Sequence, residues 1–136
     1  MLRPVYPWSH ASSPLSPQEF HVLLALADKE CYAYQLKGQV MKDSLGSVNI
    51  ADGTLYPLLS RLHGIGFVDM TGRKAAGKSG KTRLHYALSA EGRLRLIEEL
   101  QRLSHVMKLS ENRGLLDEIG PVDMAKLLLD MQKAEN

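Results

Sequence analysis

The sequence predicts a mainly α-helical fold with a small β-hairpin, and three observations support this class. Apolar residues recur at helical spacing in three successive segments, at about residues 16–27, 32–43 and 51–65. The period then changes to the alternation of strands over residues 67–73 and 82–88, on either side of a glycine-rich loop. A long amphipathic segment begins at Ser89. The predicted order is therefore three helices, a hairpin and a further helical region.

Size and composition set the limits of this arrangement. The 136 residues fit one domain with an appendage. We expect an irregular arm over residues 1–15, a globular domain over residues 16–88 and a helical region over residues 89–136. Hydrophobic residues make up 44% and charged residues 24% of the chain, as in ordinary soluble proteins. The single Cys31 excludes an intrachain disulfide and favours a reducing, cytoplasmic setting. No apolar run reaches the roughly 20 residues of a membrane span, so no membrane contact is expected.

The first three helices have clear boundaries. Ser16, Pro17 and Glu19 have the spacing of a capping box with proline at the first helical position. Gly46 marks the turn before the third helix, and Gly66 ends that helix. The third helix has apolar residues at i, i+3, i+4 and i+7, which predicts one buried face: Leu55, Leu58, Leu59 and Leu62.

The opposite face of the third helix carries small and polar residues. Its members are Gly53, Thr54, Tyr56, Pro57, Ser60, Arg61 and Gly64. Small residues let a helix backbone come close to a duplex, while hydroxyl and guanidinium groups can contact phosphates. Two helices, a turn and a third amphipathic helix form the pattern of a helix-turn-helix, whose last helix lies in the DNA major groove. By itself this pattern also fits an ordinary three-helix bundle.

Charge is unevenly distributed, although the net charge is only +2. Residues 73–83, within the hairpin, carry five cations and no acid: Arg73, Lys74, Lys78, Lys81 and Arg83. From residue 111 to residue 136, six acids outnumber three cations. A cationic hairpin directly after the third helix is suited to the phosphates beside a groove. We therefore expect these five cations to contact DNA, together with five residues of the third helix: Gly53, Thr54, Tyr56, Ser60 and Arg61.

The helix after Ser89 is predicted to pack on a partner helix. Four of its apolar residues lie 4, 3 and 4 positions apart, which is the spacing of a coiled-coil seam: Leu96, Leu100, Leu103 and Met107. Gly120 and Pro121 predict the start of a last helix with one apolar face, formed by Met124, Leu127, Leu128 and Met131. We expect both helices to form a homodimer interface through Leu96, Leu100, Leu103, Met107, Leu127 and Leu128.

Several motifs, in this order, resemble the PadR family of winged helix-turn-helix regulators. They are YQLK at residues 34–37, GTLYPLLSRL at 53–62, GFV at 66–68 and YALSAEG at 86–92. The resemblance covers roughly residues 15–103. It implies a dimeric transcriptional repressor that binds double-stranded DNA, with residues 51–65 in the major groove and the wing, residues 67–88, on the phosphate backbone. It further implies that Thr54, Tyr56 and the lysines of residues 74–81 face DNA.

Two residues depart from the family's pattern. Ala33 stands where the family usually has glycine before the tyrosine. Asp52 places a negative charge beside the expected DNA face, where it either caps the helix or takes part in base reading. Asp52 and the low net charge keep open an alternative function, that of a winged-helix protein-interaction module without DNA binding.

The sequence suggests no catalytic or metal site, so we expect neither an enzyme nor a cofactor. The histidines are scattered at His10, His21, His63, His85 and His105. One cysteine is too few for the usual metal sensors. A small-molecule effector is a hypothesis that rests on the family resemblance alone. The only tryptophan, Trp8, lies in the N-terminal arm, so the sequence shows no aromatic effector pocket.

Overall fold

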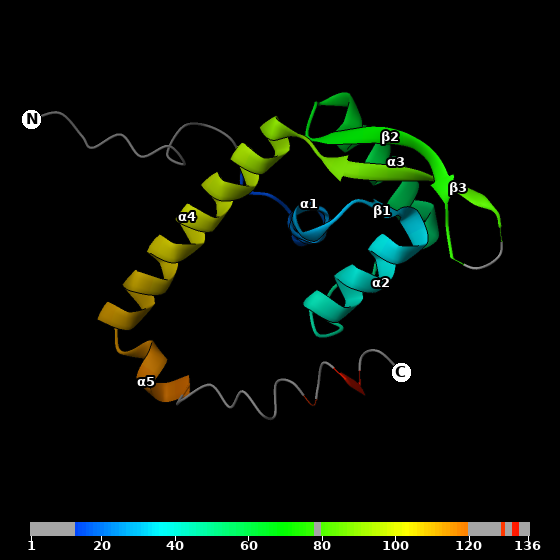
Figure 1. Cartoon of the computed structure of the whole chain (residues 1–136). Coiled ribbons are helices and arrows are strands. Elements are labelled where there is room, and N and C mark those ends of the chain that lie inside the picture. The colour runs from blue at the N-terminus through cyan, green and yellow to red at the C-terminus, as the bar shows by residue number, and fades with distance from the viewer. Residues whose placement is uncertain (1–12, 78–79, 120–128, 130–131, 134–136) are drawn as a thin grey trace, which may run out of the picture.

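The computed structural model describes residues 13–77, 80–119, 129 and 132–133. Within them the elements run in the order α1 (Pro17–Asp28), β1 (Cys31–Tyr32), α2 (Ala33–Asp43), α3 (Asp52–Gly64), β2 (Val68–Ala75), β3 (Thr82–Leu88), α4 (Ala90–Asn112) and α5 (Leu115–Ile119). Figure 1 shows the sheet and α1–α3 grouped on one side, while α4 runs away from the sheet along the other. The predicted class, mainly α-helical with a small β-sheet, is confirmed.

The sheet has three antiparallel strands in the order β1-β3-β2. The β2–β3 register runs from Val68 opposite Leu88 to Ala75 opposite Thr82, with an irregularity between Met70 and Gly72. The hairpin was predicted, but β1 was not, and this corrects the expected two-stranded arrangement. Tyr32, which we expected in the second helix, pairs with His85 in the sheet instead.

The predicted helix starts at Ser16 and Ser89 are both present. The Ser16 hydroxyl accepts from the Glu19 backbone N–H at 3.1 Å, and the Glu19 carboxylate accepts from the Ser16 N–H at 2.8 Å. The Ser89 hydroxyl accepts from the Gly92 N–H at 2.9 Å and donates to the Gly66 carbonyl. The second contact fastens the start of α4 to the turn that ends α3.

The core lies between α1, α2, α3 and the sheet. Val22, Leu23, Leu36 and Val40 are fully buried there. The leucines predicted for the inner face of α3 join them, which confirms the phase of this helix: Leu55, Leu58, Leu59 and Leu62. Each leucine buried in this way contributes roughly 1.5–3 kcal/mol relative to an exposed one. This packing holds the opposite face of α3 toward solvent.

The region after α4 differs from the prediction. The short α5 was not predicted, because Gly114 was expected only to end the preceding helix. The expected helix that starts at Gly120, with Leu127 and Leu128 of its apolar face, lies outside the described residues. In the described part of the chain, no helix has both the length and the apolar character needed to cross a membrane.

Candidate nucleic-acid interface

The solvent side of α3 carries all five of the residues predicted to contact DNA. They are exposed along the helix: Gly53, Thr54, Tyr56, Ser60 and Arg61. Tyr56 has 60% of its surface exposed. A Cβ atom built on Gly53 or Gly64 would meet no other atom within 4 Å. The face is therefore open and smooth at both ends of α3, as close approach to another large surface requires.

Two ion pairs link α3 to its neighbouring helices. The Arg61 guanidinium lies 3.1 Å from the Glu19 carboxylate of α1, and Lys37 Nζ of α2 lies 3.0 Å from Asp52 Oδ1. The α3 N-cap is Ala51, and no side chain caps this helix. Of the two roles considered for Asp52, the free chain shows neither capping nor base reading. Its carboxylate instead ties the start of α3 to α2.

The cations of the hairpin differ in their positions and in their partners. Arg73 and Arg83 line a common hollow, whereas Lys74 donates to the Glu30 carboxylate between α1 and β1. This hydrogen bond is the main reason why the pKa of Glu30 is lower than its ordinary value. Lys81 is exposed in the structure. Lys78 lies outside the described residues.

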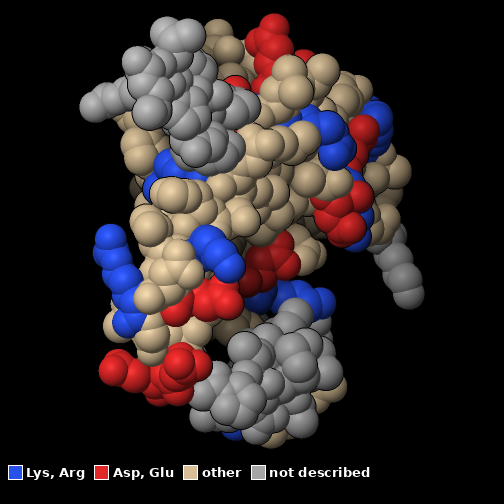
Figure 2. All heavy atoms as spheres, turned by 90° about the vertical axis from the view of Figure 1, so that its left-hand side faces the viewer, with Lys and Arg blue, Asp and Glu red and all other residues tan. Residues whose placement is uncertain are grey.

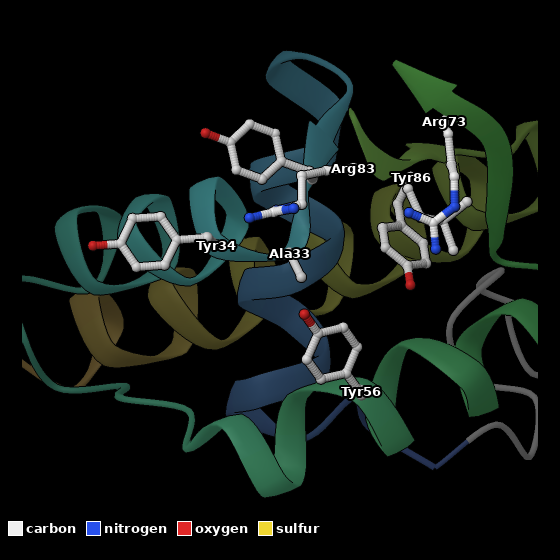
Figure 3. A pocket seen from close by; sticks show the side chains of 8 residues that line it. Ala33, Tyr34, Tyr56, Arg73, Arg83 and Tyr86 are labelled. Atoms are coloured by element: carbon white, nitrogen blue, oxygen red, sulfur yellow. The ribbon is translucent and has the colours of Figure 1, made fainter. Parts of the chain in front are cut away.

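The hollow lies where α2, α3 and the hairpin meet, and it has a volume of about 250 Å³. We call it the tyrosine–arginine hollow, after the residues that line it: Tyr32, Ala33, Tyr34, Tyr56, Arg73, Arg83, Leu84 and Tyr86. In Figure 3 the Tyr56 hydroxyl, from α3, points toward Ala33 at the start of α2, while the ring of Tyr34 points away along α2. The sequence predicted Tyr56, Arg73 and Arg83 as contact residues but did not bring them together.

The hollow is electropositive and rich in hydrogen-bond donors. Among the described residues, Arg73 and Arg83 have no carboxylate partner, and the Arg83 guanidinium donates one hydrogen bond, to the Thr82 carbonyl at 3.5 Å. Tyr86 is only 4% exposed. Burial raises the pKa of its phenol, and the neighbouring Tyr56 adds to the rise, so the hydroxyl stays protonated and able to donate. Sequence motifs contained Tyr34 and Tyr86, but nothing local indicated that they share a site.

The outer side of α4 exposes a long apolar stripe. Its exposed members are Leu94, Ile97, Leu100, Val106 and Met107. Leu103, also predicted for the interface, is half-buried. Leu96 is 4% exposed and belongs to the core of its own subunit, which corrects its assignment to the dimer interface. Figure 2 views the molecule from the side on which α4 lies and shows uncharged surface between patches of charge.

A buried carboxylate fastens the segment before α1 to α4. Glu99 is 3% exposed and accepts hydrogen bonds from Arg102 and, at 3.3 Å, from Arg95. Arg95 also donates to the Ser13 carbonyl at 2.7 Å. Burial alone would raise the pKa of Glu99, but the hydrogen bonds from Arg102 and from the Leu15 backbone, with both guanidinium charges, lower it overall.

Two histidines and the cysteine have structural roles in the domain. The Nδ1 atoms of His63 and His85 lie 2.9 and 2.8 Å from the carbonyls of Val68 and Arg83. Cys31 is buried, and this burial raises the pKa of its thiol. Within residues 13–77, 80–119, 129 and 132–133, no three His, Cys, Asp or Glu side chains are grouped so that they could hold a metal ion.

Comparison with known proteins connects this geometry to a family. The model of the transcriptional regulator PadR-like family matches residues 22–105, which include α2, α3, the hairpin and most of α4. None of the curated proteins compared with the chain matches it.

Several solved structures share the fold. A PadR-like transcriptional regulator from Bacillus cereus is 27% identical, with a TM-score of 0.59 over 70% of this chain and 88% of that one. A PadR family transcription regulator from Clostridium difficile is 24% identical, with a TM-score of 0.61 over 71% and 97% of the two chains. A Streptococcus transcriptional regulator is 24% identical, with a TM-score of 0.60 over 71% and 91%. From the family match and this shared fold, we conclude that the chain belongs to the PadR-like family of transcriptional regulators.

Proposed function

We propose that the protein is a dimeric, sequence-specific DNA-binding repressor. The recognition helix, residues 51–65, lies in the major groove of double-stranded DNA, and the wing, residues 67–88, follows the phosphate backbone beside it. Residues 89–136 form the dimerisation region, and residues 1–15 form an arm outside the DNA-binding domain. The protein acts by binding rather than by catalysis.

The observation that carries this proposal is the placement of an open α3 face beside two arginines without carboxylate partners among the described residues. Gly53 and Ser60 leave room for a groove wall, and Thr54 and Tyr56 supply hydroxyl donors on the same exposed helix. Donors of this kind position a protein on the backbone, and base-edge contacts then select the sequence. Membership in a family of transcriptional regulators supports the same function.

The exposed stripe on α4 supports the dimer. A monomer rarely exposes a contiguous row of large apolar residues, and such rows mark interaction surfaces. Leu100 and Met107 are 42% and 54% exposed at coiled-coil spacing. Three or four cations per subunit would neutralise about six to eight phosphates in a dimer, so dimerisation would strengthen DNA binding greatly.

Duplex binding as a function of salt tests this function. We expect the purified dimer to bind mixed-sequence duplex DNA with an affinity that falls steeply as salt rises. Selection from random duplexes should then yield a two-fold symmetric site, since dimers of helix-turn-helix proteins read two half-sites about one helical turn apart. A folded dimer that binds no duplex at low salt would favour the protein-interaction module instead.

The wing is tested by replacing Lys74, Lys78 and Lys81 with alanine. Binding to all duplexes should weaken and the salt slope should flatten, while the fold is retained. Lys74 contributes less than its charge suggests, because DNA must compete with Glu30 for it. Unchanged affinity in this variant would remove the wing from the phosphates.

A further inference from the structure

We propose that the tyrosine–arginine hollow is a binding site, here called the phosphate seat, for one phosphate of the DNA backbone. The start of α2 is then part of the DNA interface. This inference rests on the proposed function and adds a defined binding site to it. The hollow joins α2 to the two elements that the sequence had already indicated, through Tyr56 of α3 and through Arg73 and Arg83 of the hairpin. In the proposed complex, a DNA strand that runs beside α3 on its hairpin side would pass over the hollow.

The chemistry of the hollow matches a single phosphodiester. Its two guanidinium groups come from different strands, and no carboxylate of the described residues neutralises either of them. Planar guanidinium groups bind phosphate oxygens through paired N–H donors, and this geometry favours arginine over lysine at such sites. The lysine next to Arg73 behaves differently, because Lys74 is held by Glu30 on another part of the surface. Anion binding is thus concentrated at the arginine pair.

Two further groups of donors border the hollow. Tyr86 is 4% exposed and lines the hollow, yet its hydroxyl makes no hydrogen bond to any described residue. The hydroxyl oxygen is not among the fully buried atoms that lack a partner, so it opens into the hollow, where a ligand oxygen can accept from it. The second group is the first turn of α2, whose N-cap residue is Tyr32; the Tyr32 backbone N–H donates to the Gln35 side chain at 3.3 Å, as in a capping box.

The start of α2 borders the hollow, and its first backbone N–H groups are the donors considered at this point. Helix N-termini attract anions because their first N–H groups lack intrahelical acceptors and carry the positive end of the dipole. Ala33 and Tyr34, the first two residues of α2, both line the hollow. Figure 3 shows the Ala33 side chain facing the Tyr56 hydroxyl, with the ring of Tyr34 directed elsewhere. Arginine and tyrosine side chains from α2, α3 and the hairpin thus line the same hollow.

Charge-neutralising variants give the first test. On a mixed-sequence duplex of roughly 30 base pairs, which spans two half-sites, Arg73→Gln and Arg83→Gln should each lower affinity about tenfold at low salt. Each should also reduce the salt slope by about 0.9 for every phosphate that the variant no longer neutralises. Arg113→Gln is the matched control, because Arg113 is an exposed cation at the far end of α4. Variants of the hollow that bind like Arg113→Gln overturn the inference while leaving the proposed function intact.

A variant that keeps the charge of the hollow distinguishes a specific phosphate-binding site from general electrostatic attraction between the protein and DNA. Tyr86→Phe removes one hydroxyl, and urea unfolding should show that the fold is retained, since this hydroxyl has no described partner. We expect severalfold weaker duplex binding with an unchanged salt slope, and no additional weakening when the change is added to Arg73→Gln. Full affinity in Tyr86→Phe would mean that the phosphate does not reach this hydroxyl and would overturn the seat as described.

Inorganic phosphate distinguishes DNA from a free phosphorylated ligand as the source of the anion. Amide NMR signals of Ala33 and Tyr34 should shift when millimolar phosphate is added, and duplex DNA should move the same signals at far lower concentration. Disappearance of both responses in Arg73→Gln supports the seat. Shifts with phosphate but not with a bound duplex would assign the hollow to a free phosphorylated molecule and refute the DNA assignment. If no duplex binds at any salt, the proposed function itself fails.

Discussion

The Arg61 guanidinium of α3 lies 3.1 Å from the Glu19 carboxylate of α1, across 42 residues of sequence. The same carboxylate accepts the Ser16 N–H through its other oxygen, so it caps α1 and holds Arg61 at once. Arg61 is still 59% exposed in its side chain. The cation of the proposed recognition helix is therefore tied to its own domain in the free protein, and DNA must compete with Glu19 for it.

Replacing Glu19 by glutamine should strengthen duplex binding at low salt by a few fold. The glutamine oxygen can still accept from the Ser16 N–H, so the capping box is kept. Arg61 is released, and one negative charge per subunit leaves the interface. The salt slope should steepen by up to about 0.9 for each phosphate that Arg61 then reaches. Fluorescence anisotropy with one labelled duplex, repeated at several salt concentrations, measures both quantities.

Two controls test whether Glu19→Gln changes DNA affinity through Arg61. In the Arg61→Gln background the Glu19→Gln change should have almost no effect, because its target is absent. Glu111→Gln removes the same charge from a pair with Lys108 on α4 and should leave duplex binding unchanged. An effect of Glu19→Gln that is equally large without Arg61 would show that the charge acts through the general field and not through this pair.

Local sequence patterns predicted the elements whose causes are local. The Ser16–Glu19 capping box and the leucine face of α3 each depend on neighbours a few residues away, and both were found where expected. The hairpin was also found, but its burial does not alternate as predicted, because His85 is buried beside Tyr86. Strand β1 was missed because Cys31 and Tyr32 become a strand only by pairing with β3, more than 50 residues later. Two residues give no periodic signal, so the pattern alone assigned Tyr32 to the following helix.

The candidate site was less predictable, since it depends on long-range partners. The cations of residues 73–83 indicated that the hairpin is electropositive. They could not show that Lys74 binds Glu30, whereas Arg73 and Arg83 line one hollow. The seam spacing likewise selected Leu96, whose burial against the core depends on where α4 starts relative to the sheet. The sequence therefore predicted the chemical character of these side chains, but it did not predict which distant residues they contact.

Introducing charge into the exposed stripe of α4 should dissociate the proposed dimer. Leu100→Glu combined with Met107→Glu places carboxylates where two apolar seams would meet, and burying them unpaired is costly. Both side chains are exposed in the subunit, so helix content and the core should be retained. Sedimentation should show a monomer, and duplex binding should weaken strongly because two half-sites are no longer linked.

Gln101→Glu is the control for this change, because Gln101 is an exposed polar residue of the same helix that is not part of the predicted seam of Leu96, Leu100, Leu103 and Met107. It should remain dimeric. A dimer of unchanged dissociation constant in the double variant would place the subunit contact elsewhere.

Gly92→Ala should destabilise the protein although alanine favours helices. A Cβ atom at Gly92 would overlap the Phe67 carbonyl oxygen and lie 2.9 Å from Leu88 Cδ1, so α4 would have to move off the hairpin. Overpacking of this kind costs about 1–3 kcal/mol or more, beyond the roughly 1 kcal/mol that alanine gains in a helix. Gly38→Ala, in open space within α2, should instead stabilise by about 0.5–1 kcal/mol. Urea unfolding of both variants measures the contrast, and equal stabilities would contradict the close packing.

The buried Glu99 should make stability depend on pH. Its pKa is lowered in the folded protein despite burial, because Arg102, the Leu15 backbone and Arg95 favour the ionised form. A carboxylate with a lowered folded-state pKa contributes stability above its unfolded pKa, and this contribution is lost as pH falls through the folded-state value. Glu99→Gln removes the charge that the two arginines surround, which should cost about 1–3 kcal/mol at neutral pH.

Acid should abolish the difference between Glu99→Gln and the unmodified protein. Below the ordinary carboxyl pKa of about 4.3, protonation progressively gives the native glutamate the neutral form that glutamine imitates, so the two unfolding free energies should converge. Glu98→Gln is the control, since Glu98 is half-exposed on the next position of α4 and has no ion pair within the described residues. Unfolding is followed in urea from pH 3 to pH 7 at one protein concentration, because a dimer's stability depends on that concentration. A gap that stays constant over this range would mean that the destabilisation comes from packing at the α1–α4 contact, and that ionisation of Glu99 plays no part in it.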